Sequence, residues 1–504
     1  MKPIQKFSFF FLLIVILAII IQFSCSKNIP KDEQETILAR VGDKTISVNE
    51  FLRRAEYTIR PEYCKLDNYV HKKIILNSLI AEKLLAIEDA KQSQLLESEN
   101  FRAYIEGLQE QGMRQWMYHK KAYEKVKLDD EAVKKRFFLA GRTYNVAHFS
   151  LTNEEKASEL IQMIRAGNVT FEDAFKEISD TDTLFTKKVA WKDQENTPIH
   201  SALFNEELAQ NQIVGPVRIS DDQFMLLKVQ GWVDRKVITD TDIQRRYDEV
   251  TKYMTDASAA QLWHEYTQQV MKGKTVEFDR ETFEQIFELL SPLYFKTQQE
   301  IKNSFSEKVW HDRDISPEVP NIEDPNFINK PFFKIDGETW TVGNFTRALR
   351  YHPLVFRKHG FPKKEFAEQL KLAIVDMIKD HYVNQEGYKE AVDEISVVKR
   401  NTNMWQDSYL AIEARENFLK SRGVKENFAK EYQNIIRKHL NAWVDSLQTE
   451  YSNQIEINMD AFEKCELTHI DLFVQYKSSP FPVVVPGFPV LTDDTNLDYG
   501  KLMK

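Results

Sequence analysis

The chain has 504 residues, a net charge of −9, 42% apolar residues and only 15 glycines. Its length suggests three or four domains, and its acidic balance, without a long basic run, argues against a nucleic-acid-binding protein. It lacks a glycine-rich phosphate loop, a Cys-x-x-Cys pair and the histidine spacing of common metal sites. We therefore expect no nucleotide, metal or other cofactor.

The first 25 residues predict export from the cytoplasm. Lys2 and Lys6 precede the apolar run 7–23, and small residues flank Cys25. The segment before Cys25 resembles the lipobox of bacterial lipoproteins, in which this cysteine is lipidated, although Gln22 stands where an aliphatic residue is usual. Alternatively, the run is an uncleaved anchor, since as a helix it would span roughly 26 Å. Either way we expect a membrane-anchored protein that faces the periplasm of the bacterial envelope.

Cys64 and Cys465 are the two other cysteines. Two thiols are too few for a disulfide-rich scaffold or a cysteine-based zinc site. The envelope would permit a disulfide bond between them, but two unpaired thiols are an equal alternative.

A repeated segment organises the rest of the chain. Residues 41–57 align without gaps to residues 335–351 and share five identities with them. Both copies predict a short strand, a tight turn, a second short strand and a helix. Ser47 and Thr341 occupy the N-cap positions of these two helices.

Two further matches follow in the same order. The helical pattern at 79–91 returns at 377–389, and a helix containing Trp263 followed by a short strand returns around Trp443. We expect both tryptophans to anchor helix packing. The first copy is longer than the second by roughly one small domain, which predicts an insertion in the first. The proline-rich range 291–331 between the copies predicts a linker.

The inserted stretch has its own series of motifs. It opens with a predicted strand that contains His148, continues with two helices, and closes with a predicted strand at 223–229. The segments that carry the pattern are Ala147 to Ser150, Ala157 to Ile164, Gly167 to Ala174, Ala202 to Phe204, Gly215 to Val217, and Gln223 to Val229.

In order and spacing this series resembles the parvulin (PpiC-type) peptidyl-prolyl isomerases, and the surrounding copies resemble the chaperone core of SurA/PrsA-type periplasmic foldases. The resemblance implies an α+β, mainly helical fold with two helical chaperone cores in tandem, the first carrying an inserted parvulin-like α/β domain. The expected boundaries are 1–25 for the signal or anchor, 36–143 and 235–290 for the two parts of the first core, 144–234 for the parvulin-like domain, 291–331 for the linker, 332–470 for the second core, and 471–504 for a proline-rich tail.

The positions that serve catalysis in parvulins are only partly kept. These enzymes place two histidines and a Cys or Asp beside an apolar proline pocket. His148 matches the first histidine, which makes it the candidate catalytic residue, with a core histidine as the equal alternative. Met225 stands at the second histidine, and Thr181 stands at the Cys or Asp, with Asp182 next to it. Isomerase activity therefore stays open, and we favour a domain kept for binding.

Three apolar residues are the candidate substrate contacts of this domain. They are Phe204, Phe224 and Met225. Phe224 and Met225 alternate along a strand, so that one should face the core while the other lines the former proline pocket.

The expected function is that of an envelope chaperone that binds unfolded or partly folded exported polypeptides, outer-membrane proteins among them. Two alternatives remain open, an active peptidyl-prolyl cis-trans isomerase and a structural lipoprotein subunit of an envelope assembly machine. The tail 471–504 is either a plain extended tail or a segment that binds the protein itself or a partner.

Overall fold

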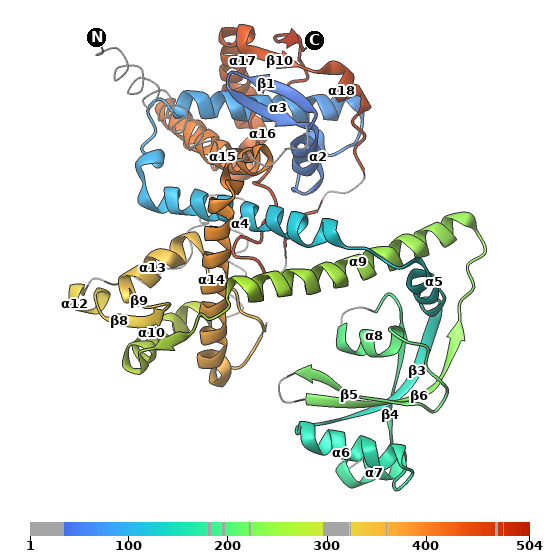
Figure 1. Ribbon diagram of the computed structural model, residues 1–504. Coiled ribbons are helices and arrows are strands. Elements are labelled where there is room, and N and C mark those ends of the chain that lie inside the picture. Colours follow the sequence, from blue (N-terminus) through green and yellow to red (C-terminus); the bar gives the residue numbers. More distant parts are fainter. Residues whose placement is uncertain are drawn as a thin grey trace, which may run out of the picture. The chain divides into compact units, whose positions relative to one another are not determined.

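A computed structural model describes residues 35–179, 183–193, 197–220, 223–295, 322, 324–358, 360–468, 472–476 and 478–503. The export segment with Cys25, the pair Thr181 and Asp182, and most of the predicted linker lie outside the described residues. The chain divides into two compact units, which we call unit 1 (up to residue 117 and from residue 267) and unit 2 (118–266). Helices predominate and the sheets are small, so the mainly helical α+β class is confirmed (Figure 1).

Both copies of the repeat in unit 1 form two short strands followed by helices. The first copy gives β1 (Ile37–Val41), β2 (Lys44–Ser47), α2 (Val48–Glu56), α3 (Tyr69–Asp89) and α4 (Glu99–Lys121). The second gives β8 (Pro331–Ile335), β9 (Glu338–Thr341), α13 (Val342–Tyr351), α14 (Phe366–Lys389) and α15 (Ser396–Ser421). The short helix α12 (Pro325–Ile328) precedes β8.

The later part of each copy also has matching elements. After the first copy come α9 (Asp240–Val270), β7 (Val276–Phe278) and α10 (Arg280–Tyr294). After the second come α16 (Phe428–Ile435), a π-helical turn (Ile436–Leu440), α17 (Asn441–Glu450), β10 (Ile455–Ile457), α18 (Met459–Lys464) and β11 (Lys501–Leu502). Helices α4 and α9 each contain residues of both units.

The predicted helix caps are present. The Ser47 hydroxyl accepts a hydrogen bond from the Glu50 amide at 3.0 Å. Thr341 and Asn344 form a reciprocal capping box, in which each side chain accepts from the backbone amide of the other. Both caps satisfy amides that the first turn of a helix leaves without intrahelical partners, and so they define where α2 and α13 begin.

The two copies exchange their closing strands. β10 pairs antiparallel with β1, so that Ile455 lies opposite Val41. β7 pairs antiparallel with β8, so that Val276 lies opposite Ile335. Val41 and Ile335 are equivalent positions of the repeat, and so are Val276 and Ile455. The closing strand of each copy therefore completes the sheet of the other copy and not its own.

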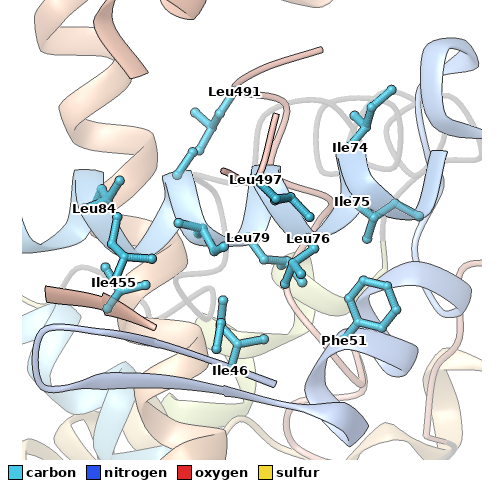
Figure 2. Packing of buried hydrophobic residues seen from close by; sticks show 14 of the residues in the cluster. Ile46, Phe51, Ile74, Ile75, Leu76, Leu79, Leu84, Ile455, Leu491 and Leu497 are labelled. Atoms are coloured by element: carbon cyan, nitrogen blue, oxygen red, sulfur yellow. The ribbon is translucent and has the colours of Figure 1, made fainter. Parts of the chain in front are cut away.

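The helices of unit 1 follow the same exchange. α3 of the first copy packs along α15 of the second. α14 of the second copy contacts α4 of the first, where Arg114 hydrogen bonds with Asn384 at 2.9 Å. Two buried clusters result. The α3 core lies around α2 and α3 with β10, α15 and α17, and the α14 core lies around β8, α13 and α14 with β7 and α10. Figure 2 shows the α3 core, where Ile46 of β2, Leu79 of α3 and Ile455 of β10 converge.

Unit 2 contains a four-stranded antiparallel sheet in the order β4-β3-β6-β5. Its elements are α5 (Asp130–Leu139), β3 (Arg142–Leu151), α6 (Glu154–Arg165), α7 (Phe171–Ile178), β4 (Phe185–Ala190), α8 (Thr197–Phe204), β5 (Ile213–Ser220) and β6 (Gln223–Asp234). Helices α6 and α7 cover one face of the sheet, and α8 with part of α9 covers the other (Figure 1). The range predicted as parvulin-like, 144–234, lies within this unit.

The C-terminal residues are extended and packed against unit 1. Phe481, Val485 and Leu491 are each at most 4% exposed. β11 pairs in parallel with β10. Of the two alternatives for the tail, the chain thus takes that of a segment bound to the protein itself. Among the described residues, no helix is both long enough and apolar enough to cross a membrane.

Candidate functional site

The candidate catalytic residue His148 lies on β3 of unit 2 and is partly buried. Strand alternation places it on the same face of the sheet as Tyr144 and Val146, which pack toward α8. Its ring stacks on Phe185 with 6.1 Å between the ring centroids. Burial and the nearby Lys187 ammonium both lower the pKa of His148, so the imidazole is neutral at neutral pH.

The three candidate substrate contacts separate onto the two faces of the sheet. Met225 lies on the α8 face with His148, because Met225 is opposite Ser150 and His148 is opposite Leu227 in the register of β3 and β6. Phe204 of α8 is fully buried on that same face. Phe224 is 5% exposed on the other face, in the core under α6 and α7. Phe224 and Met225 thus lie on opposite faces of the sheet, as strand alternation predicts, and each packs against the core of its own face.

The face that carries His148 is mostly apolar. Within the ranges that the structure covers, no hydrogen bond reaches the His148 ring, and Thr181 and Asp182 are not among those ranges. Phe185 beside the ring is 53% exposed. This arrangement offers an imidazole beside an apolar contact surface, which suits binding of an apolar side chain.

Sequence reasoning missed His200, a fully buried histidine on α8. Its Nε2 lies 2.8 Å from the Trp191 carbonyl oxygen, and its Nδ1 lies 3.3 Å from the Tyr253 hydroxyl. Burial lowers the pKa of His200. The residue joins the segment after β4 to α8 and α9 and therefore acts in packing. The sequence places His200 four residues before Phe204, on the same face of a helix, and this spacing could have predicted that His200 packs in the core.

A second candidate site lies in unit 1, where the protein holds part of its own C-terminus, residues 479–491, which we call the C-terminal strap. Three strap carbonyl groups accept hydrogen bonds from side chains. Phe481 O accepts from Gln111 Nε2 at 2.7 Å, Val484 O from Arg53 at 2.8 Å, and Gly487 O from Arg54 at 2.7 Å. The Phe481 amide also donates to Gln111 Oε1 at 2.9 Å. α4 and α2 thus bind the main chain of the strap.

The strap carbonyls are bound at every third residue. Pro480, Pro482, Pro486 and Pro489 remove amide donors from the segment and favour an extended chain. A proline-rich chain keeps its carbonyl groups as acceptors but has few amide groups to donate to a neighbouring strand. Side-chain donors on α2 and α4 hold this chain by its backbone, together with the main-chain hydrogen bond from the Tyr476 amide to the Pro482 carbonyl.

Apolar side chains of the strap fill the groove between α4 and α15. The Phe481 ring meets the Tyr104 ring edge to face, with centroids 5.2 Å apart. Val484 and Val485 join the same cluster as Trp405 of α15. Farther along, Phe488 and Leu491 enter the α3 core, and Figure 2 shows Leu491 above α3. The groove therefore combines backbone donors with aromatic and aliphatic pockets.

A buried charge network lies below the strap. Arg54 pairs with Glu82 through two hydrogen bonds of 2.8 and 2.7 Å. Lys83 lies 2.9 Å from Glu50 and 3.1 Å from Asp407. Burial alone lowers the pKa of Lys83, but the surrounding carboxylates outweigh it and raise this pKa. The pair with Glu82 orients the Arg54 guanidinium toward the Gly487 carbonyl of the strap.

Unit 1 also exposes apolar side chains on the connection between α2 and α3 and on the first turn of α3. Ile59, Leu66, Tyr69 and Val70 are between 48% and 60% exposed. Such a grouping is typical of an interaction surface.

Elsewhere in unit 1, Cys64 and Cys465 are both buried and both free of disulfide bonds. No group of three or more metal-ligating side chains occurs within the described part of the chain.

Comparison with known proteins gives no relative for this chain, since no protein-family model, curated protein or solved structure matches it significantly.

Proposed function

We propose that the protein is an envelope-anchored periplasmic chaperone that binds unfolded exported polypeptides. In this proposal the chain carries two SurA/PrsA-like helical cores in tandem, and the first holds a parvulin-like domain that is degenerate in catalysis. The observation that carries the proposal is that side chains of unit 1 bind the backbone of its own extended strap. A protein that binds many unfolded chains must hold the backbone they share, and Arg53, Arg54 and Gln111 do this with the strap.

The exposed apolar side chains on the connection between α2 and α3 and on the first turn of α3 support the same function. Unfolded clients display aromatic and aliphatic side chains, and a chaperone gains affinity by burying them at about 25 cal/mol per Å². Tyr69 and Val70 are 48% and 52% exposed at the beginning of α3. Several such weak contacts on one molecule add through effective concentration.

The test is suppression of aggregation. A chemically denatured outer-membrane protein is diluted into buffer with the full-length chain in mild detergent, and light scattering is followed. We expect the chain to suppress scattering at stoichiometric amounts, and the double variant Tyr69→Ser/Val70→Ser to suppress it several-fold less. Lys134→Ser is the control, since Lys134 is exposed and its ion pair with Glu131 lies within one helix. Undiminished aggregation with a large excess of the chain would contradict the proposal.

The degenerate parvulin-like domain gives a second measurable expectation. A neutral His148, with Met225 on the same face of the sheet, provides little polar stabilisation for a twisted prolyl amide, whose rotation faces a barrier of about 20 kcal/mol. In a protease-coupled assay on an Ala-Pro tetrapeptide, we expect the chain to accelerate isomerisation less than about twofold. His148→Ala should leave that rate unchanged. A strong acceleration that His148→Ala abolishes would instead favour an active isomerase.

A further inference from the structure

The C-terminal strap occupies a groove of unit 1 whose chemistry is not limited to this one segment. Gln111, Arg53 and Arg54 contact strap carbonyl groups, which every polypeptide has. The pockets for Phe481 and for the two valines accept common apolar side chains. Specificity for the strap thus resides mainly in its being extended, apolar and rich in proline.

We propose that the strap is an exchangeable occupant of this groove, and that the groove is the binding site for extended, proline-containing apolar segments of unfolded polypeptides. The proposal rests on the proposed chaperone function, because it names where a client chain binds. It adds a regulatory step, since the strap must leave before the client segment enters.

The anchoring of the strap is uneven along its length, which makes exchange feasible. Before the strap, the side chains of Leu472, Phe473 and Tyr476 are between 38% and 62% exposed. The backbone of this segment is held by the strap itself, since the Tyr476 amide donates to the Pro482 carbonyl at 2.7 Å. Beyond the strap, β11 stays attached to β10. The stretch from Phe481 to Gly487 can therefore leave the groove together with the segment that pairs with it, while the distal end remains bound. The strap then acts as a tethered competitor at high effective concentration.

Tethered competition has a quantitative consequence. The apparent association constant for a client segment is the intrinsic constant multiplied by the fraction of molecules whose groove is open. A strap that is closed in 99% of molecules therefore weakens binding about a hundredfold. A change confined to the strap should therefore raise client affinity without altering the groove. A change in the groove should lower it.

The experiment uses a fluorescein-labelled peptide with the sequence of residues 478–492 and measures anisotropy with the full chain. Phe481→Asp puts an unpaired charge into the Tyr104 pocket and releases the strap. We expect this variant to bind the peptide at least about tenfold more tightly than the unsubstituted chain. Leu502→Asp is the matched control, because it adds the same charge to the tail at a side chain that is 72% exposed. It should bind like the unsubstituted chain.

The contribution of the groove residues is tested in the Phe481→Asp chain, which we call the released variant. Gln111→Leu removes both hydrogen bonds to the backbone at the Phe481 position, so Phe481→Asp/Gln111→Leu should lose at least about tenfold in peptide affinity. A released variant that folds but binds the peptide no better than Leu502→Asp overturns the proposal. So does a released variant that forms a dimer which the peptide cannot dissociate, because the groove would then serve a second copy of the chain.

Hydrogen exchange on the unsubstituted chain covers the case in which Phe481→Asp does not fold. Mass spectrometry compares fragments that contain the Phe481 amide with fragments from the middle of α3. We expect the strap to exchange at least about a hundredfold faster, through local opening. Equal protection of the two regions would mean that the strap leaves only on global unfolding, and the proposal would be wrong.

The outcomes also separate this proposal from the chaperone function. If the chain suppresses aggregation but the released variant gains no peptide affinity, clients bind elsewhere and only the groove assignment fails. If the released variant binds the peptide tightly while neither form suppresses aggregation, the groove assignment stands and the chaperone function fails.

Discussion

In the α3 core, α2 contributes Arg54 and α3 contributes Lys83, whereas the equivalent positions in the α14 core hold Ala348 and His381. Both arginine and lysine are at most 1% exposed and paired with carboxylates. The α14 core is filled instead by phenylalanine rings, among them those of Phe332, Phe333, Phe345 and Phe366. Two copies of one strand-and-helix unit thus reach a packed state by different means.

The difference follows from what each core must hold. Arg54 pairs with Glu82 and also donates to the Gly487 carbonyl of the strap. The methyl side chain of Ala348, at the equivalent position, has no hydrogen-bond donor and contributes only packing. Aromatic rings stabilise a core without needing specific partners. Buried charges, in contrast, do not favour folding unless every charge has its partner. The buried Arg54–Glu82 pair is therefore best explained by the strap carbonyl that Arg54 binds.

The largest expected effect comes from breaking that charge network. Arg54→Met leaves Glu82 buried without its partner, and we expect a loss of about 3–5 kcal/mol in the free energy of unfolding. Urea denaturation followed by circular dichroism measures it. The double variant Arg54→Met/Glu82→Leu should recover most of the loss, because no unpaired charge remains. Arg347→Ala, the exposed equivalent of Arg53 in the second copy, should change stability by no more than about 0.5 kcal/mol.

The contact between α4 and α14 contains a buried carboxyl group. Glu110 of α4 is buried against α14, where Asn384 donates to it at 2.7 Å and Tyr388 at 3.4 Å. Burial raises the pKa of Glu110 from 4.5 to about 7, and Arg114 offsets only part of this effect. Since the pKa is higher in the folded state than in the unfolded state, the folded protein holds more protons between these two values. The contribution of Glu110 to stability should therefore fall as the pH rises from about 4.5 to about 7.

Glu110→Gln tests this pH dependence. The amide keeps an oxygen for Asn384 but cannot ionise, so the variant should be more stable than the parent chain above pH 7, by up to about 3 kcal/mol, and equal to it near pH 4. Urea melts from pH 4 to 8.5 measure the difference. Glu368→Gln, an exposed change on α14, should leave the pH profile unaltered. A profile that Glu110→Gln does not flatten would contradict the assignment.

The sequence predicts the local elements of this fold well. The caps at Ser47 and Thr341, the paired short strands and the alternation of Phe224 and Met225 all follow from residue type and spacing. These features depend on neighbours within a few residues. The mainly helical class follows from the same periodicities.

Long-range choices are not contained in that pattern. Val41 and Ile335 present equally apolar strand edges, so the spacing does not decide that β10 pairs with the first copy and β7 with the second. Prolines predict that the tail is extended but not that Gln111 binds its backbone 370 residues away. The candidate site in unit 1 was missed for this reason, because its donors are polar residues on helices that have no motif of their own.

The smallest expected effect concerns the close approach of the strap and α13 to α4 at Gly107. A Cβ atom there would lie 2.1 Å from the Tyr351 carbonyl oxygen and 2.6 Å from the Phe481 ring. Gly107→Ala should therefore cost about 1–3 kcal/mol in the free energy of unfolding, although alanine favours a helix. Gly112→Ala is the matched control on the same helix, because its nearest neighbour would be 3.8 Å away. It should be neutral or stabilising by up to about 1 kcal/mol. Equal effects of the two variants in thermal melts would mean that neither the strap nor α13 packs against Gly107.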